Sequence, residues 1–336
     1  MAKKSANLSA LSKNLSLDQR KKGTPPTAVS GWQSPRTYDP KKIKFPNLNV
    51  PTKSTVGIIY RTNTGAARDL TLLFSKWLGQ QKIKAFLSED VAGGNKTSLL
   101  NDTHRPSLSL LIAIGGDGTY LRAARFLEGH KIPILGINMG SLGFLTAFSP
   151  ETAPQAIADH FAKKLKIQNR AMLKLQVIRK QKIVAEFVAL NDIVVERGSH
   201  SQLIETSISL SENIISRTKA DGFIIATPTG STAYNLAAGG PILHPETPAF
   251  ILSFVAPHSL TTRPIILPQE ESILLRLNED RRQQAKLIID GESLLELKEN
   301  DILKISKSER AHQFLQPSDY DFFRLLRTKL KFGERD

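Results

Sequence analysis

The chain has 336 residues, a formal net charge of +15 and no cysteine. Its length suits about two domains, each with a sizeable core, and the lack of cysteine excludes disulfides, thiolate zinc sites and cysteine nucleophiles. The sequence has no apolar run of membrane-spanning length and no signal-peptide core, so we expect a cytoplasmic protein that makes no membrane contact.

Residues 1–54 hold most of the positive charge. Eleven Lys or Arg and two Asp occur there, which gives a net charge of +9 of the total +15. The segment is also rich in Ser, Thr, Asn and Pro, a composition that favours a disordered basic tail over a core-forming unit. Binding of nucleic acid or an anionic surface, and an organelle transit peptide, remain alternatives for this tail.

Residues 55–150 alternate short apolar runs with helix-like stretches. Strands are expected at 56–60, 83–87, 108–114 and 132–137, and a helix at 66–78. This alternation is typical of a parallel sheet covered by helices. It predicts an α/β nucleotide-binding domain.

Residues 151–318 have a different texture. Apolar and polar residues alternate there in short runs that turn signals divide, which predicts antiparallel strands. Residues 319–336 contain an amphipathic helical pattern and are expected to pack back on the first domain. The chain is therefore predicted to combine an α/β domain, a β-rich domain and a C-terminal helix.

The sequence Gly115-Gly116-Asp117-Gly118-Thr119 follows the apolar run 108–114. Glycines let a phosphate approach backbone N–H groups closely, and the start of the next helix adds partial positive charge. Open α/β sheets bind ligands at this end of their strands. The segment matches neither GxxxxGK[ST] nor GxGxxG, so it predicts another kind of polyphosphate site, with an ordinary turn as the alternative.

A second motif lies in residues 221–245. An expected strand at 223–226 leads into Thr227-Pro228-Thr229-Gly230-Ser231-Thr232, whose hydroxyls can donate hydrogen bonds to phosphate or ribose oxygens. Ala233-Tyr234-Asn235 can begin a helix. Taken alone, this loop could also be purely structural.

With Asn191-Asp192 and NMGSLGFLTAF at 138–148, these two motifs make the chain resemble the NAD kinase family over residues 55–333. The GGDGT sequence also occurs in diacylglycerol kinases, sphingosine kinases and phosphofructokinases, whereas TPTGSTAYNLAAGGPI is particular to NAD kinases. The segments APHSLTTRP and DFFRLLRTKLKFG are also similar to that family. The resemblance implies a Rossmann-like domain joined to an all-β domain, and a homodimer or homotetramer.

The resemblance further implies that the terminal phosphate of ATP passes to the 2′-hydroxyl of the adenosine ribose of NAD, giving NADP. Asp117 matches the family's general base, which accepts the proton of this poor nucleophile. A divalent cation, most simply Mg²⁺, would bridge phosphate oxygens, and the substrates would largely hold it because no carboxylate cage is evident. The other residues that the resemblance assigns to substrate binding are Gly115, Gly116, Gly118, Thr119, Arg122, Asn191, Asp192, Lys219, Asp221, Thr229, Thr232, Ala233, Tyr234, Asn235, Leu236 and Ala237.

The expected roles of three of these residues need further comment. Many family members have Glu where this chain has Asp192, so its contact is one methylene shorter. Tyr234 is expected either to stack on a base or only to pack. Lys219 occupies a position that varies within the family. Members with a charged residue there tend to use ATP and to prefer NAD, whereas members with glycine tend to accept polyphosphate and both NAD and NADH.

Two other functions are compatible with parts of the sequence. A lipid kinase would share GGDGT, but the polar TPTGSTAYN loop does not suit an acyl chain. A protein that senses NAD or NADP without turnover would not need Asp117 beside anionic phosphates. Nucleic-acid binding is not expected outside the basic tail, because the rest of the chain has no basic and aromatic recognition pattern.

Overall fold

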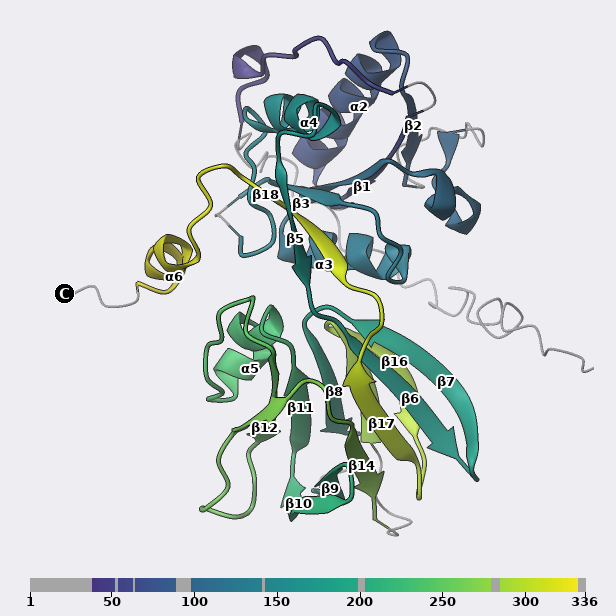
Figure 1. Ribbon diagram of the computed structural model, residues 1–336, viewed down its shortest axis with the longest axis vertical. Coiled ribbons are helices and arrows are strands. Elements are labelled where there is room, and N and C mark those ends of the chain that lie inside the picture. The colour runs from purple at the N-terminus through teal and green to yellow at the C-terminus, as the bar shows by residue number, and fades with distance from the viewer. Residues whose placement is uncertain are drawn as a thin grey trace, which may run out of the picture. The chain divides into compact units, whose positions relative to one another are not determined.

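The structure, a computed structural model, describes residues 38–51, 54–62, 64–88, 98–140, 143–198, 203–278 and 285–331. Three six-stranded sheets form within these ranges (Figure 1). The first has the strand order β2-β1-β3-β4-β18-β5, in which only β5 runs antiparallel to its neighbour. Its strands are β1 (Thr55–Tyr60), β2 (Lys84–Leu87), β3 (Leu110–Gly115), β4 (Ile134–Asn138), β5 (Lys166–Arg170) and β18 (His312–Gln316). The expected parallel sheet is confirmed.

Helices cover both faces of this sheet. They are α2 (Gly65–Gln80), α3 (Asp117–Leu127) and α4 (Ala153–Phe161). On one face, Ile112 of β3 shares a core cluster with Phe74 of α2 and Ile157 of α4. On the other face, Leu111 shares a cluster with Tyr120 of α3. Strand β3 is buried on both sides, which explains why its sequence is an unbroken apolar run.

Residues 38–51 correct the expectation of a disordered tail that extends to residue 54. Tyr38 and Ile43 are buried in the core beside α2. The Phe45 ring centroid lies 5.0 Å from that of Trp77, and the Trp77 indole donates a hydrogen bond of 3.1 Å to the Pro46 carbonyl. These apolar residues stand among lysines, whose charge dominated the composition of the segment. The rest of the predicted tail, apart from residue 54, lies outside the described residues, at 1–37 and 52–53.

The other two sheets form an antiparallel sandwich. Their strand orders are β10-β9-β14-β17-β6-β7 and β13-β12-β11-β8-β15-β16. The strands are β6 (Leu173–Arg179), β7 (Lys182–Ala189), β8 (Asp192–Arg197), β9 (Ile204–Leu210), β10 (Asn213–Ala220), β11 (Gly222–Ala226), β12 (Ala249–Val255), β13 (Ile265–Pro268), β14 (Ile273–Leu277), β15 (Ala285–Ile289), β16 (Glu292–Leu297) and β17 (Ile302–Lys307). Alternate residues such as Leu175, Leu275 and Leu287 fill the core between the sheets. The predicted β-rich region is confirmed.

Two neighbouring strands, β5 and β18, connect the sandwich to the first sheet (Figure 1). Sheet membership thus places 153–170 and 312–316 with the α/β part, although both fall within the predicted β-rich range 151–318. Helix α6 (Phe322–Leu330) follows β18. Its Phe322 ring lies 5.2 Å from His244, in the loop before β12. No helix in the described ranges is long and apolar enough to cross a membrane.

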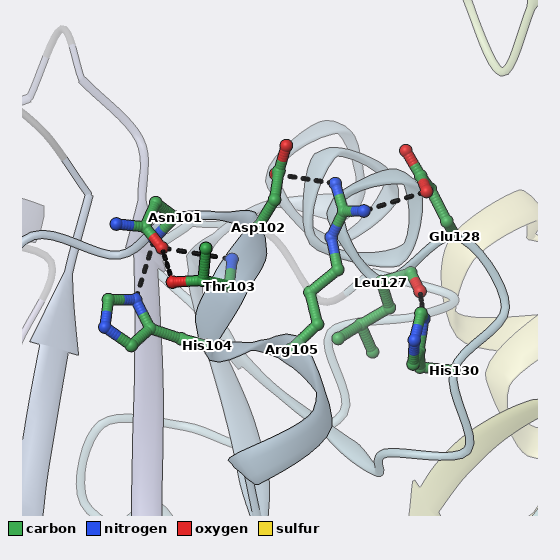
Figure 2. Close-up of polar contacts among 8 residues, drawn as sticks. All are labelled: Asn101, Asp102, Thr103, His104, Arg105, Leu127, Glu128 and His130. Carbon is green, nitrogen blue, oxygen red and sulfur yellow. Dashed lines mark hydrogen bonds and ion pairs between the residues drawn. The ribbon is translucent and has the colours of Figure 1, made fainter. Parts of the chain in front are cut away.

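The C-terminal end of α3 contacts two other segments of the chain through Arg105 and Arg310. Arg105, in the short helix Asp102–Ser107, forms ion pairs with Asp102 at 2.7 Å and with Glu128 at 2.8 Å (Figure 2). Glu128 caps α3 in a left-handed conformation, and its carbonyl accepts a 2.9 Å hydrogen bond from Arg310. These contacts fix the helix that begins with Asp117.

Candidate active site

Asp117 is the first residue of α3, directly after β3 and the N-cap residue Gly116. A Cβ at Gly115 would lie 2.3 Å from the Thr119 hydroxyl oxygen, so this position requires glycine. A Cβ at Gly116 or Gly118 would meet no atom within 4 Å. The turn therefore leaves open space above the backbone at the start of a helix, where a phosphate is favourably placed.

The Asp117 carboxylate binds the loop at 143–146. Its Oδ2 accepts from the Phe144 N–H at 2.8 Å, and its Oδ1 accepts from the N–H groups of Leu145 and Thr146 and from the Thr146 hydroxyl, each at 3.1 Å. A Cβ at Gly143 would lie 2.1 Å from Oδ1, so glycine is required there too. The loop fixes the orientation of the carboxylate, and Oδ2 accepts from a single donor among the described residues.

The Thr146 hydroxyl is itself oriented by Asn138 at the end of β4. The Asn138 side-chain nitrogen donates to it at 2.8 Å, so the hydroxyl proton is left to point at Asp117. The segment 138–148 contributes to the family resemblance, but the sequence alone did not predict a role for Thr146 or Gly143 in the site. Arg122, which it did assign, donates a hydrogen bond to the Tyr60 carbonyl at the end of β1.

Asn191 and Asp192 form a buried corner where β8 begins. The Asn191 side-chain oxygen is buried and has no hydrogen-bond partner in the part of the chain that the structure describes. Burial, together with the nearby Asp290 carboxylate, raises the pKa of Asp192 to about 7. A buried polar atom without a partner is unfavourable unless a ligand supplies one, so these two side chains are candidates for contact with a ligand.

The hydroxyl-rich loop after β11 is bound to this corner. The Thr227 N–H donates to the Asn191 carbonyl at 2.8 Å, and the Thr227 hydroxyl donates to the Leu190 carbonyl at 2.6 Å. The same hydroxyl accepts from the Gly230 N–H at 3.0 Å. The structure therefore brings Asn191, Asp192 and the loop at 227–232 together.

Replacing Gly230 by Ala is expected to destabilise the fold by about 1 to 3 kcal/mol, the usual cost of inserting atoms into a packed site. The new Cβ would lie 2.1 Å from the Asn191 carbonyl oxygen, a backbone atom that cannot move away cheaply. Urea denaturation measures the change. Gly65→Ala is the control, because its Cβ would meet no atom within 4 Å. Equal stability of the two variants would contradict the close approach at Gly230.

The short helix α5 (Tyr234–Ala237) presents residues of two kinds. Asn235 is buried, and its amide is fully used: it donates to the carbonyls of Ser231 and Pro241 at 3.0 Å each and accepts from the Ser253 hydroxyl at 2.7 Å. Asn235 therefore stabilises the loop that precedes α5. Tyr234 is 38% exposed, which leaves its ring accessible to a ligand.

Two predicted residues lie at the opposite end of β11. Strand pairing sets Ala226 opposite Asp192 and Gly222 opposite Glu196, so Asp221 is separated from Asp192 by the length of the strand, about 17 Å at ~3.3 Å per residue. Asp221 forms an ion pair of 3.0 Å with Arg197. Lys219 pairs with Glu205 at 3.2 Å.

Tyr234 lies beside Glu196 of β8. Burial raises the pKa of its phenol to about 12, with the Glu196 carboxylate beside it contributing and Asp192 and Asp221 adding smaller effects. Sequence reasoning missed Glu196, whose position in a strand gives no signal of its own. Among the described residues, no group of three or more His, Cys, Asp or Glu could hold a metal ion.

Comparison with known proteins identifies the family. The profile of the ATP-NAD kinase N-terminal domain matches residues 56–165, and that of the ATP-NAD kinase C-terminal domain matches residues 190–316, together well over half of the chain. The chain belongs to the NAD kinase family. The NAD kinase of Bdellovibrio bacteriovorus is 44% identical over 298 residues, which cover 88% of this chain and 98% of that protein. The NAD kinase of Solibacter usitatus is 36% identical, covering 85% and 100%.

Solved structures agree with this assignment. Yeast NADH kinase complexed with NADH has a TM-score of 0.77 and 25% identity, covering 84% of this chain and 89% of that one. An NAD kinase from Archaeoglobus fulgidus in complex with ATP shares the fold, with a TM-score of 0.65 and 24% identity over 82% of this chain and 99% of that one. Membership of the NAD kinase family confirms the resemblance predicted from the motifs. The chain is an enzyme that phosphorylates NAD to NADP.

Proposed function

We propose that this NAD kinase transfers the terminal phosphate of ATP to the 2′-hydroxyl of the adenosine ribose of NAD, with Asp117 as general base. The observation that carries the proposal is the fixed Asp117 carboxylate beside the open glycine turn. The family description, ATP-NAD kinase, supports ATP as the donor. The yeast relative bound to NADH supports a dinucleotide as the acceptor.

In the proposed step, the ribose oxygen attacks the terminal phosphorus of ATP and its proton passes to Oδ2 of Asp117. The bond from that phosphorus to the bridging oxygen breaks, and ADP leaves with the electron pair. Oδ2 accepts one hydrogen bond from the loop, at 2.8 Å, so a lone pair is left for the proton. A positioned base contributes about 10²- to 10⁴-fold to such a reaction.

The nucleotide enters this scheme as its complex with a divalent cation such as Mg²⁺. The described residues offer no cluster of three or more potential ligands, and the Asp117 carboxylate already accepts four hydrogen bonds. The cation therefore belongs with the substrate phosphates. The open backbone at Gly116 and Gly118, with the N-terminus of α3, offsets phosphate charge from the protein side.

NAD binds in this proposal at the corner of Asn191 and Asp192. The unpartnered Asn191 oxygen accepts a hydrogen bond from the dinucleotide, and Asp192 contacts a ribose hydroxyl. The exposed Tyr234 ring stacks on a base, and the hydroxyls of Thr229 and Thr232 contact ribose or phosphate oxygens. Asn235 supports this surface from beneath.

The experiment is to incubate the full chain with NAD, ATP and Mg²⁺ and to follow product with a dehydrogenase specific for NADP. Diacylglycerol and labelled ATP are offered in a parallel reaction. We expect NADP, with the new phosphate on the 2′-oxygen of the adenosine ribose by NMR, and no labelled lipid. Phosphate at another ribose position would overturn the proposed acceptor.

Lys219 is expected to favour ATP over polyphosphate and NAD over NADH. Its ammonium is paired with Glu205 at 3.2 Å, which fixes a charged group at the Asp221 end of β11. We expect the rate with ATP to exceed that with polyphosphate by at least about tenfold, or about 1.4 kcal/mol in activation free energy. We expect Lys219→Gly to reduce the difference between the rates with ATP and with polyphosphate. The control is Lys304→Gly, at an exposed lysine of β17. Equal rates with both donors in the wild type would contradict this role.

A further inference from the structure

The carboxylate of Asp290 holds the backbone of the Asn191 and Asp192 corner. Asp290 lies in the turn between β15 and β16 and is 8% exposed. Its Oδ2 accepts from the Leu190 N–H at 2.9 Å, and its Oδ1 accepts from the N–H groups of Asn191 and Asp192 at 2.7 and 3.1 Å. Its own N–H donates to the Asp192 carbonyl at 3.1 Å. Three consecutive N–H groups thus share one acceptor side chain.

The carbonyls of the same corner are satisfied from the other side. Thr227 donates to the carbonyls of Leu190 and Asn191 through its hydroxyl and its N–H. Asp290 and Thr227 therefore use the backbone polar groups of the corner, and among the described residues the buried Asn191 side-chain oxygen has no partner. Removing one buried acceptor would leave several N–H groups unsatisfied at once.

The turn that bears Asp290 also contacts the helix that begins with Asp117. Arg125 of α3 donates to the Asp290 carbonyl at 3.4 Å and forms an ion pair with Glu292. Burial raises the pKa of Asp290, while the three backbone N–H donors and, to a smaller extent, Arg125 act in the opposite direction. One helix thus connects the candidate base to the turn that fixes the corner.

We propose that Asp290 is a positioning residue for NAD: by holding the backbone of residues 190–192 against α3, it places the side chains of Asn191 and Asp192 at a fixed separation from Asp117. The inference rests on the proposed contact of Asn191 and Asp192 with NAD. Asp290 itself touches no substrate in this scheme. Its contribution is to avoid the cost of ordering the corner when the dinucleotide binds.

The test is Asp290→Asn in the full chain. Asn has the same size, but its NH₂ group cannot accept a hydrogen bond and would face one or more backbone N–H groups. We expect KM for NAD to rise by at least about tenfold, equivalent to 1.4 kcal/mol. KM for ATP should change by less than about twofold, because the glycine turn keeps its contacts. Direct titration of NAD binding checks that the change in KM is a change in affinity.

The matched control is Asp301→Asn. Asp301 is also a buried carboxylate in the sandwich, and it accepts from Arg179 at 2.7 and 2.6 Å and from the Lys298 N–H at 2.9 Å, away from the corner. It is expected to lower the melting temperature without changing KM for NAD. A second variant, Arg125→Met, loosens the same turn while keeping the apolar stem, and should raise KM for NAD by a smaller factor.

Three outcomes would overturn the proposal. KM for NAD could stay unchanged in a folded Asp290→Asn, KM for NAD and ATP could rise equally, or Asp301→Asn could raise KM for NAD as much. If Asp290→Asn does not fold, an unchanged KM for NAD in Arg125→Met would likewise overturn it. Asn191→Ala separates the two proposals: normal NAD affinity in that variant would contradict the proposed NAD contact itself, whatever Asp290 does.

Discussion

Asp117→Asn is expected to lower kcat for NADP formation by at least about 10²-fold while the protein stays folded. The amide keeps one oxygen that can accept hydrogen bonds from the loop at 143–146, but it cannot take the proton of the ribose hydroxyl. The carboxylate accepts from Phe144 through one oxygen and from Leu145 and Thr146 through the other, so partial anchoring survives. Initial rates at saturating NAD and ATP, together with a melting curve, measure both properties.

The control for this variant is Thr146→Val. It removes the hydroxyl that donates to Asp117 at 3.1 Å but keeps the carboxylate and the backbone donors. A loss in kcat well below that of Asp117→Asn would be expected, because the base remains. If both variants lost activity equally, Asp117 would act by anchoring the loop, and its assignment as the base would be wrong. The rate of Asp117→Asn is not expected to recover at high pH, because the Asn amide cannot accept the hydroxyl proton at any pH.

The architecture could be predicted where the pattern was local. Residues 110–114 have no polar side chain because β3 is covered on both faces, and the alternation after residue 170 follows the two faces of the sandwich. Strands β5 and β18 were not assigned to the first sheet, because their pairing joins residues far apart in the sequence. Composition also concealed the ordered part of residues 1–54, where lysines surround Tyr38, Ile43 and Phe45.

In the candidate site, too, contacts between residues far apart in the sequence could not be predicted. GGDGT and the loop at 227–232 have sequence signatures, because they need glycine and hydroxyl side chains in a fixed order. Asp290-Gly291 instead matches an ordinary hairpin turn: both residues have positive φ, 48° and 78°, as Asp-Gly does in type I′ turns. Nothing local indicates that this carboxylate binds N–H groups 98 to 100 residues away. Tertiary hydrogen bonds to backbone leave no pattern in the sequence.

Asp192→Asn is expected to stabilise the protein at pH 8 and to have little effect on stability at pH 4. Burial, then the neighbouring Asp290 carboxylate, raises the pKa of Asp192 from 3.8 to about 7. The folded state therefore retains a proton that the unfolded state releases, so this group makes folding less favourable as the pH rises from about 4 to about 7. Each pKa unit corresponds to about 1.4 kcal/mol, which predicts a gain of a few kcal/mol at pH 8.

Urea denaturation at pH 4, 6 and 8 measures this dependence, with Asp319→Asn as the control because that carboxylate is exposed beside Arg324. The difference between Asp192→Asn and wild type should grow with pH, whereas Asp319→Asn should show no comparable trend. An equal gain at pH 4 and pH 8 would contradict the raised pKa. The same variant should bind NAD more weakly if Asp192 contacts a ribose hydroxyl. Greater stability together with weaker binding would show that the buried carboxylate serves the ligand at the expense of the fold.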